Sequence, residues 1–203
     1  MKDSLRAKEY EVVTITTYPH TIELAEQVAL ACQKAGADPI TLLETDEVFY
    51  GQHKNYSLEN LRKTSAHCLG LAAYTQSYIW LGGPKDPGRM ATVPKERWEA
   101  VNEGEQAHTD KWLETKPKSV GVGLGQVTRE RAARYGFNYA SWKRNVENAI
   151  AINYRQMEKF GRTVAGLLSV PVSVRVTADN GTDLRFRLAG ASRKPHVNDG
   201  VIS

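Results

Sequence analysis

Five histidines are the side chains of this sequence best suited to bind a metal ion or transfer a proton: His20, His53, His67, His108 and His196. No two of them lie at metal-ligand spacing with a cysteine or an acidic residue beside them on one helix face. His20 follows the first expected strand, at the edge where open α/β sheets hold ligands. It is the strongest candidate of the five, although a structural role at a helix start explains it more simply. His108 lies on a charged helix face and is expected to be solvated.

An acidic trio, Glu44, Asp46 and Glu47, follows the second expected strand. Such clusters are commonly solvated loop carboxylates, but their place at the carboxyl end of a strand keeps them as a ligand-site candidate. The strand ends could bring His20 near Glu44 or Asp46. A hydrolytic metal site needs three or more protein ligands and an open position for water, and no third ligand is evident. The sequence therefore predicts no catalytic, cofactor-binding or metal-binding residue in this chain.

A glycine-rich segment, Gly121-Val122-Gly123-Leu124-Gly125, lies between an expected strand and a helix, where glycines can let a backbone approach a phosphate. The spacing differs from a dinucleotide fingerprint, which needs its third glycine near Val127. We therefore expect these glycines to serve close packing between strand and helix. A P-loop and a Gly-x-Ser-x-Gly nucleophile elbow are both absent from the sequence.

The tryptophans and cysteines could each belong either to the core or to a functional site. Four tryptophans, Trp80, Trp98, Trp112 and Trp142, could line a pocket, but their strand and helix spacings favour the core. Cys32 and Cys68 lie in apolar stretches, so we expect reduced core residues, which are typical of a cytoplasmic protein.

Strands and helices are expected to alternate over the first part of the chain. The helices begin near Pro19, at Ser57, where one helix is expected to run to Leu71, and at Pro94. The expected strands are Val12–Thr16, Ile40–Leu43, Tyr78–Leu81 and Val120–Leu124. This alternation predicts parallel crossovers and a three-layer, Rossmann-like α/β fold.

The pattern changes towards the carboxyl end. A short helix ending at Gly136 and one long helix from about Tyr139 through Leu167 are expected. Two alternating stretches around Asn180-Gly181 then predict an antiparallel β-hairpin. We expect an α/β domain over residues 1–170 and a β-hairpin element over 171–203, the start of an incomplete second domain.

A two-stranded hairpin is marginal by itself, so it should need more sheet, a packed helix or another chain. Its apolar residues are Val172, Val174, Val176, Leu184, Phe186 and Leu188. A homo-oligomer or a completing protein partner is the resulting expectation.

Composition narrows the classes of function. The 203 residues are 41% hydrophobic and 25% charged, with a net charge of +4 that is scattered rather than concentrated in a basic tract. No apolar run approaches the roughly 18 residues of a membrane span, and the charged first ten residues have no signal-peptide pattern. We expect a cytoplasmic protein that binds neither nucleic acid nor membranes.

Several segments, in the same order, resemble the N-terminal half of the aminopeptidase T family of metallo-aminopeptidases, to which dihydroxypyridine ring-opening dioxygenases are related. The most specific is Asn180-Gly181-Thr182-Asp183-Leu184, followed by the Asp199-Gly200 turn. The others are Ala35-Gly36-Ala37-Asp38-Pro39, Tyr78-Ile79-Trp80-Leu81-Gly82-Gly83-Pro84, and Gly121–Thr128 with Ala132, Ala133 and Gly136.

The resemblance implies a divalent metal in the full-length family, on ligands that follow the Asp-Gly turn and lie beyond Ser203. No catalytic residue can be carried over to this chain, and hydrogen bonds within the turn explain Thr182 and Asp183. Three functions stay open. The chain is part of a metal-dependent enzyme that removes N-terminal residues from peptides and is inactive alone, a metal-free peptide-binding or assembly module, or part of a ring-cleaving dioxygenase.

Overall fold

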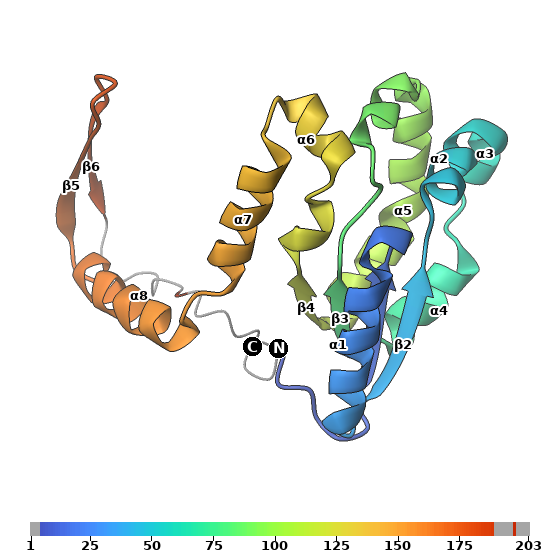
Figure 1. The fold of residues 1–203 in the computed structure, drawn as a ribbon, viewed down its shortest axis with the longest axis horizontal. Coiled ribbons are helices and arrows are strands. Elements are labelled where there is room, and N and C mark those ends of the chain that lie inside the picture. The colour runs from blue at the N-terminus through green and yellow to red at the C-terminus, as the bar shows by residue number, and fades with distance from the viewer. Residues whose placement is uncertain (1–4, 189–196, 198–203) are drawn as a thin grey trace. The chain divides into compact units, whose positions relative to one another are not determined.

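The computed structural model describes residues 5–188 and Val197 (Figure 1). The described residues fold as two compact units, one of residues 5–150 and the other of residues 151–188 with Val197. Helix α8 (Tyr154–Leu168) therefore belongs to the same unit as the hairpin, whereas the predicted domain boundary at residue 170 would put it in the α/β domain. That domain boundary stays a prediction.

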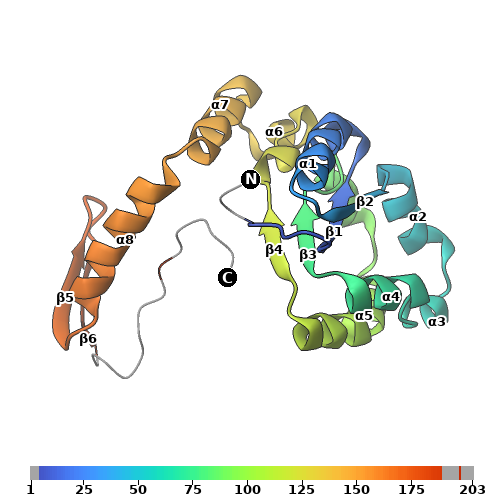
Figure 2. The ribbon, with the colours of Figure 1, turned by 90° about the horizontal axis from the view of Figure 1, so that it is seen from below.

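A four-stranded parallel sheet organises the first unit (Figure 2). Its strands are β1 (Val12–Thr17), β2 (Asp38–Leu43), β3 (Ser77–Trp80) and β4 (Lys118–Gly121), in the order β2-β1-β3-β4. All three pairings are parallel, with Val13 opposite Ser77 and Ser77 opposite Lys118. The predicted α/β class is confirmed.

Every second residue of the central strands points towards helix α1 (Ile22–Lys34), and the apolar side chains of this set form a core with the helix. Val13, Ile15 and Ile79 are fully buried in this core together with Val28 and Cys32 of the helix. The 3-10 turn Pro19–Thr21 leads into α1, and Gly36, with φ +81°, follows its end. The predicted helix and its stop at Gly36 are confirmed, as is the core position of Cys32.

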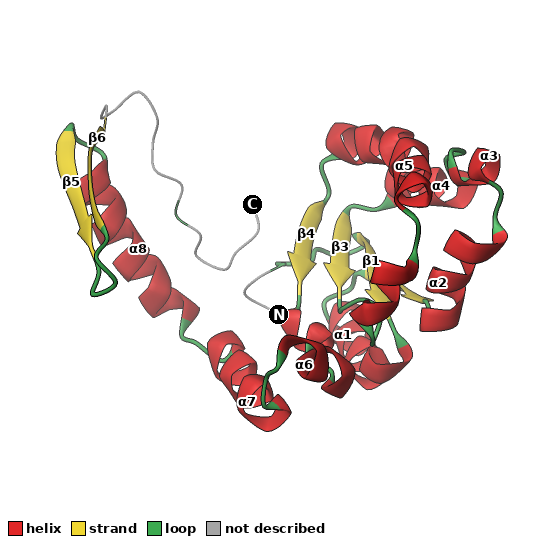
Figure 3. Ribbon diagram, turned by 90° about the horizontal axis from the view of Figure 1, so that it is seen from above, coloured by secondary structure: helices red, strands yellow, loops and turns green. Residues whose placement is uncertain are grey.

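Helices α4 (Ala66–Tyr74) and α5 (Lys95–Thr115) lie on the other side of the sheet (Figure 3). The prediction of a single helix from Ser57 to Leu71 was wrong, because the segment forms two helices: α3 (Leu58–Leu61) ends early, and α4 begins after Ser65. The Thr64 hydroxyl, between them, donates to the Gly104 carbonyl of α5 and fixes the break. Ser57 is the expected N-cap and accepts from the Asn60 amide. Helix α2 (Asp46–Asn55) was not predicted.

The end of the first unit corrects two further boundaries. β4 stops at Gly121, and Gly123–Gln126 forms a 3-10 turn, so the strand does not extend to Leu124. α6 (Arg129–Tyr135) ends at Gly136 as predicted. The expected long helix is two helices, α7 (Tyr139–Ile150) and α8, because Asn153 caps the second by accepting from the Gln156 amide at 3.1 Å.

The second unit contains α8 and the antiparallel pair β5 (Val172–Thr177) and β6 (Asp183–Leu188). Asn180 Oδ1 accepts from both the amide and the hydroxyl of Thr182, and Asp183 pairs with Arg175 at 2.7 Å. The predicted hairpin is thus confirmed. The Thr182 and Asp183 side chains make structural contacts, but with the side chains of Asn180 and Arg175 and not with the turn backbone as expected. The predicted Asp199-Gly200 turn lies outside the described residues, and none of the helices described is long and apolar enough to cross a bilayer.

A buried ion pair joins three strands at their amino-terminal ends. Glu11, only 7% exposed, accepts from Lys118 Nζ at 2.6 Å, from the Lys8 amide at 2.7 Å and from the Ser77 hydroxyl. Lys118 Nζ also donates to the Leu5 carbonyl at 3.1 Å. Burial alone would raise the pKa of Glu11, but these partners together lower it below its ordinary value.

Candidate functional site

The strand order creates a crevice at the carboxyl edge of the sheet. The chain leaves β1 towards β2 on one side and leaves β3 towards β4 on the other, although β1 and β3 are neighbours. Their following loops therefore diverge, and open α/β sheets hold ligands outside the strand ends at such a point.

A cavity of about 730 Å³ lies at this edge. It is lined by Tyr18 after β1, Glu44 after β2, Gly82 and Gly83 after β3, and Phe49 of α2. A second, open cavity, of about 520 Å³, lies between the sheet and helices α4 and α5, and it shares Trp80 and five other lining residues with the first. The volumes match those of small-molecule sites. We call the first of these the edge cavity.

Glu44 presents its carboxylate in the edge cavity. The Tyr18 hydroxyl donates to Glu44 Oε2 at 2.7 Å, and Tyr18 itself is 5% exposed. Burial and the neighbouring Glu44 raise the pKa of Tyr18 far above its ordinary value, so the phenol keeps its proton and remains a donor. Among the described residues, no cation lies within ion-pair distance of Glu44.

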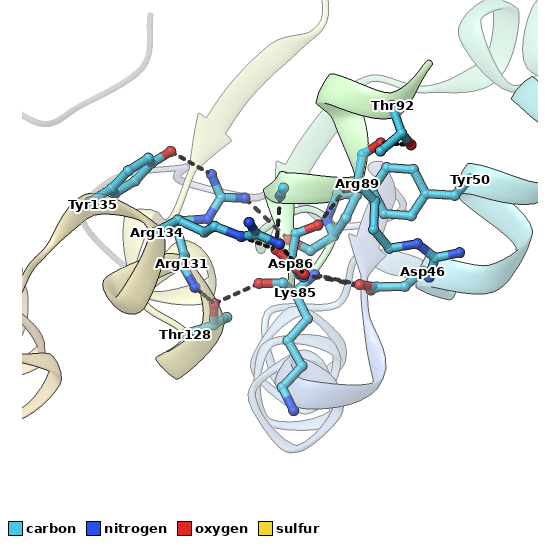
Figure 4. Close-up of polar contacts among 12 residues, drawn as sticks. Asp46, Tyr50, Lys85, Asp86, Arg89, Thr92, Thr128, Arg131, Arg134 and Tyr135 are labelled. Carbon is cyan, nitrogen blue, oxygen red and sulfur yellow. Dashed lines mark hydrogen bonds and ion pairs between the residues drawn. The ribbon is translucent and has the colours of Figure 1, made fainter.

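Asp46 has a different task, because it holds the loop that forms one wall of the cavity (Figure 4). Its carboxylate accepts from the Lys85 amide at 3.0 Å and from the Asp86 amide at 3.3 Å. From the other side, the Thr128 hydroxyl donates to the Lys85 carbonyl at 2.7 Å, and Arg131 donates to the Pro84 carbonyl at 3.1 Å. The loop after β3 is thus fixed by α2 and by α6 together.

Further contacts tighten the same loop. The Tyr50 hydroxyl donates to the Asp86 carbonyl at 2.7 Å (Figure 4). The Gly88 amide and the Arg134 guanidinium both bond the Asp86 carboxylate, and they lower its pKa. Glu47 pairs with Arg89 at 2.6 Å, and that guanidinium stands 4.5 Å from the centre of the Tyr50 ring. The acidic trio therefore does not act as one cluster, since only Glu44 faces the cavity without a cation.

His20 lies elsewhere. Its Nε2 is 2.9 Å from the Gly125 carbonyl, and it lines a separate cavity of about 390 Å³ with Lys85 and Glu130. In the part of the chain that the structure describes, His20 forms neither a hydrogen bond nor an ion pair with Glu44 or Asp46. His20 lies in the 3-10 turn that leads into α1, and its structural role stays a prediction.

The remaining histidines show no shared site. His53 is 2% exposed, with its ring 4.2 Å from that of Trp98, and His67 bonds Ser65 on the surface. His108 is half-buried beside Trp112 and lines the second cavity, so its side chain is only partly solvated. His196 lies outside the described residues. Within residues 5–188 and Val197, no three His, Cys, Asp or Glu side chains come together as a metal site.

The glycine-rich segment serves close packing, as predicted. A Cβ on Gly125 would stand 1.5 Å from the Leu81 carbonyl oxygen, and one on Gly121 would press on the Trp80 ring at 3.2 Å. A Cβ on Gly123 would meet nothing within 4 Å. The backbone of the Gly123–Gln126 turn therefore rests directly on the end of β3.

Sequence reasoning missed most of the cavity walls. Trp80 and Trp112 are half-buried and line cavities, as does Cys68, so the expectation that they are core residues was wrong. The available signal was the alternation of Tyr78 and Trp80 with buried Ile79, which sends two aromatic rings to the face away from α1. Tyr78 also bonds the Thr16 hydroxyl at 2.8 Å on that face.

Comparison with known proteins finds likeness at the level of structure. No protein-family model and no curated protein matches the sequence. Among solved structures, wild-type AmpT from Thermus thermophilus, an aminopeptidase T, superposes with a TM-score of 0.58 at 12% sequence identity. The match covers 90% of this chain and 55% of AmpT. The two proteins share a fold, and this chain spans about half the length of its solved neighbour.

Proposed function

We propose that this chain is the α/β part of an aminopeptidase-like protein that removes N-terminal residues from peptides, and that it is inactive alone. The observation that carries the proposal is the match to AmpT over 90% of the chain. The order of the resembling segments, from Ala35 to the hairpin at Asn180, supports the same relationship.

A metal centre does not fit the residues that the structure describes. Glu44, Asp46 and His20 would be the nearest donors, but each has a separate partner: the Tyr18 hydroxyl, the Lys85 amide and the Gly125 carbonyl. A hydrolytic zinc site takes three protein ligands and leaves one position for water. We therefore derive no metal-dependent step for this chain.

Calorimetry tests the proposal. Metal-stripped protein is titrated with zinc, cobalt and manganese, and hydrolysis of leucine amide is measured in parallel. We expect neither sub-micromolar metal binding nor turnover. Sub-micromolar binding together with turnover that His20→Ala abolishes would place an active site in the α/β unit and overturn the proposal. Gln27→Ala, at an exposed residue of α1 that does not line the edge cavity, is the control.

A metal-free assembly module is the second candidate, because the hairpin exposes apolar side chains. Val176, Leu184 and Phe186 are 44%, 54% and 42% exposed. Apolar surface of this kind favours contact with another chain, either a second copy or a completing partner. A cytoplasmic location is also proposed, since Cys32 and Cys68 are both free.

A further inference from the structure

The edge cavity contains a carboxylate whose charge the protein does not balance. Glu44 is half-buried and uses Oε2 to accept the Tyr18 hydrogen bond, while Oε1 has no hydrogen-bond partner among the described residues. Its neighbours differ, because Asp46 holds two backbone amides and Glu47 holds Arg89. A half-buried carboxylate without a counter-charge attracts a cation.

The other charged groups of the lining do not neutralise Glu44. Glu105 is an exposed acid and adds negative charge. Arg131 is the cation of the described lining, and it donates to the Pro84 carbonyl and to the Tyr135 hydroxyl. His67 is exposed and bonded to Ser65. The net charge of the cavity lining around Glu44 is therefore negative.

Aromatic rings supply the walls near this carboxylate. Phe49, Tyr50, Tyr78 and Trp80 line the cavity, and Phe49 and Tyr50 meet edge to face at 5.1 Å between ring centres. Aromatic faces attract cations and also bury apolar surface. Tyr50 shows this property in the structure, since the Arg89 guanidinium already stands over its ring.

We propose that the edge cavity binds a primary organic ammonium ion with an apolar or aromatic body. The ammonium group donates to Glu44 Oε1, and the body lies against Phe49 and Trp80. The cavity volume of about 730 Å³ accommodates such a ligand. The proposal goes beyond the aminopeptidase-like assignment and does not rest on it, because every residue used belongs to the first unit.

The probe is 2-phenylethylamine, which is charged at neutral pH, and its neutral counterpart is 2-phenylethanol. Binding to the full chain is followed by calorimetry and by tryptophan fluorescence at pH 7 in low salt. We expect saturable binding of the amine, with the alcohol bound at least tenfold more weakly. Glu44→Gln should weaken amine binding by roughly 10-fold to 100-fold, the range for losing a charged hydrogen-bond partner.

Two further variants make the result decisive. Glu26→Gln removes an exposed acid of α1 that does not line the edge cavity, so amine binding should be unchanged. Phe49→Leu keeps an apolar wall but removes the ring, so amine binding should weaken several-fold even if Glu44→Gln proves unstable in thermal melts. No saturation by the amine, equal binding of the alcohol, or wild-type affinity in a folded Glu44→Gln protein would each overturn the proposal.

Discussion

Replacing Glu11 by glutamine tests the ion pair that joins the amino-terminal ends of β1, β3 and β4. The carboxylate accepts from Lys118, from Ser77 and from the Lys8 amide, and it is almost fully buried. Glutamine has the same shape but only one acceptor oxygen, and its amide group meets donors where the second oxygen stood. The variant therefore loses the charge and at least one hydrogen bond without leaving a cavity.

The magnitude follows from the partners that remain. Breaking a fully buried ion pair costs about 3–5 kcal/mol, and a hydrogen bond to a charged group contributes about 1.5–3 kcal/mol. The Lys118 side chain is 25% exposed and keeps its bond to the Leu5 carbonyl, which lowers the penalty on the remaining charge. We expect Glu11→Gln to reduce the free energy of unfolding by ~2–4 kcal/mol at pH 7.

Urea unfolding followed by circular dichroism measures this difference, and its pH dependence adds a second test. Because the folded pKa of Glu11 is lowered, its stabilisation is fully present above the ordinary value of 4.5 and is lost as the pH falls through the folded pKa. The gap between wild type and variant should therefore shrink in acid. Glu26→Gln, at an exposed acid of α1, is the control. A loss no greater than that of the control, or a gap independent of pH, would refute the reasoning.

Three further predictions concern the core, the glycine turn and the hairpin. Ile79→Asp places a carboxylate at a fully buried position and should cost ~4 kcal/mol or more, so a melting temperature like that of the parent would contradict the packing of β3. Gly125→Ala should cost at least ~2 kcal/mol because of the Leu81 carbonyl, whereas Gly123→Ala should be nearly neutral in the same urea titration. The exposed apolar hairpin should drive self-association or partner binding, which is measured by sedimentation at micromolar concentration. Phe186→Lys should weaken this association. A strictly monomeric wild type without a partner would count against the prediction.

The strands were predictable because each has a local signature. β-Branched runs and helix caps such as Ser57 and Gly36 are short-range signals, and they located the sheet and most helix starts. The breaks between helices were harder to predict from the sequence. Thr64 ends the α3 turn by bonding Gly104, a residue of a different helix, so the signal exists only after the chain has folded.

Only the location of the candidate site could be predicted from the sequence. The rule that ligands bind at strand ends pointed to the edge that contains Glu44 and Asp46. It could not distinguish their roles, because these depend on partners distant in sequence: Asp46 accepts from the amide of Lys85, and Glu44 accepts from the hydroxyl of Tyr18. Asp46 thus has a structural role, two residues from a carboxylate whose Oε1 has no hydrogen-bond partner among the described residues.

The fixed loop after β3 has a consequence for the rate of binding. Asp46 of α2 and Thr128, the N-cap of α6, hold this cavity wall through bonds within the protein. A ligand then meets an already formed surface, and no rare conformation has to be selected first. In stopped-flow mixing, the observed rate should rise linearly with amine concentration without reaching a plateau. Thr128→Val, which removes the bond to the Lys85 carbonyl and the cap on the Arg131 amide, should introduce a slow phase by letting the wall open and close.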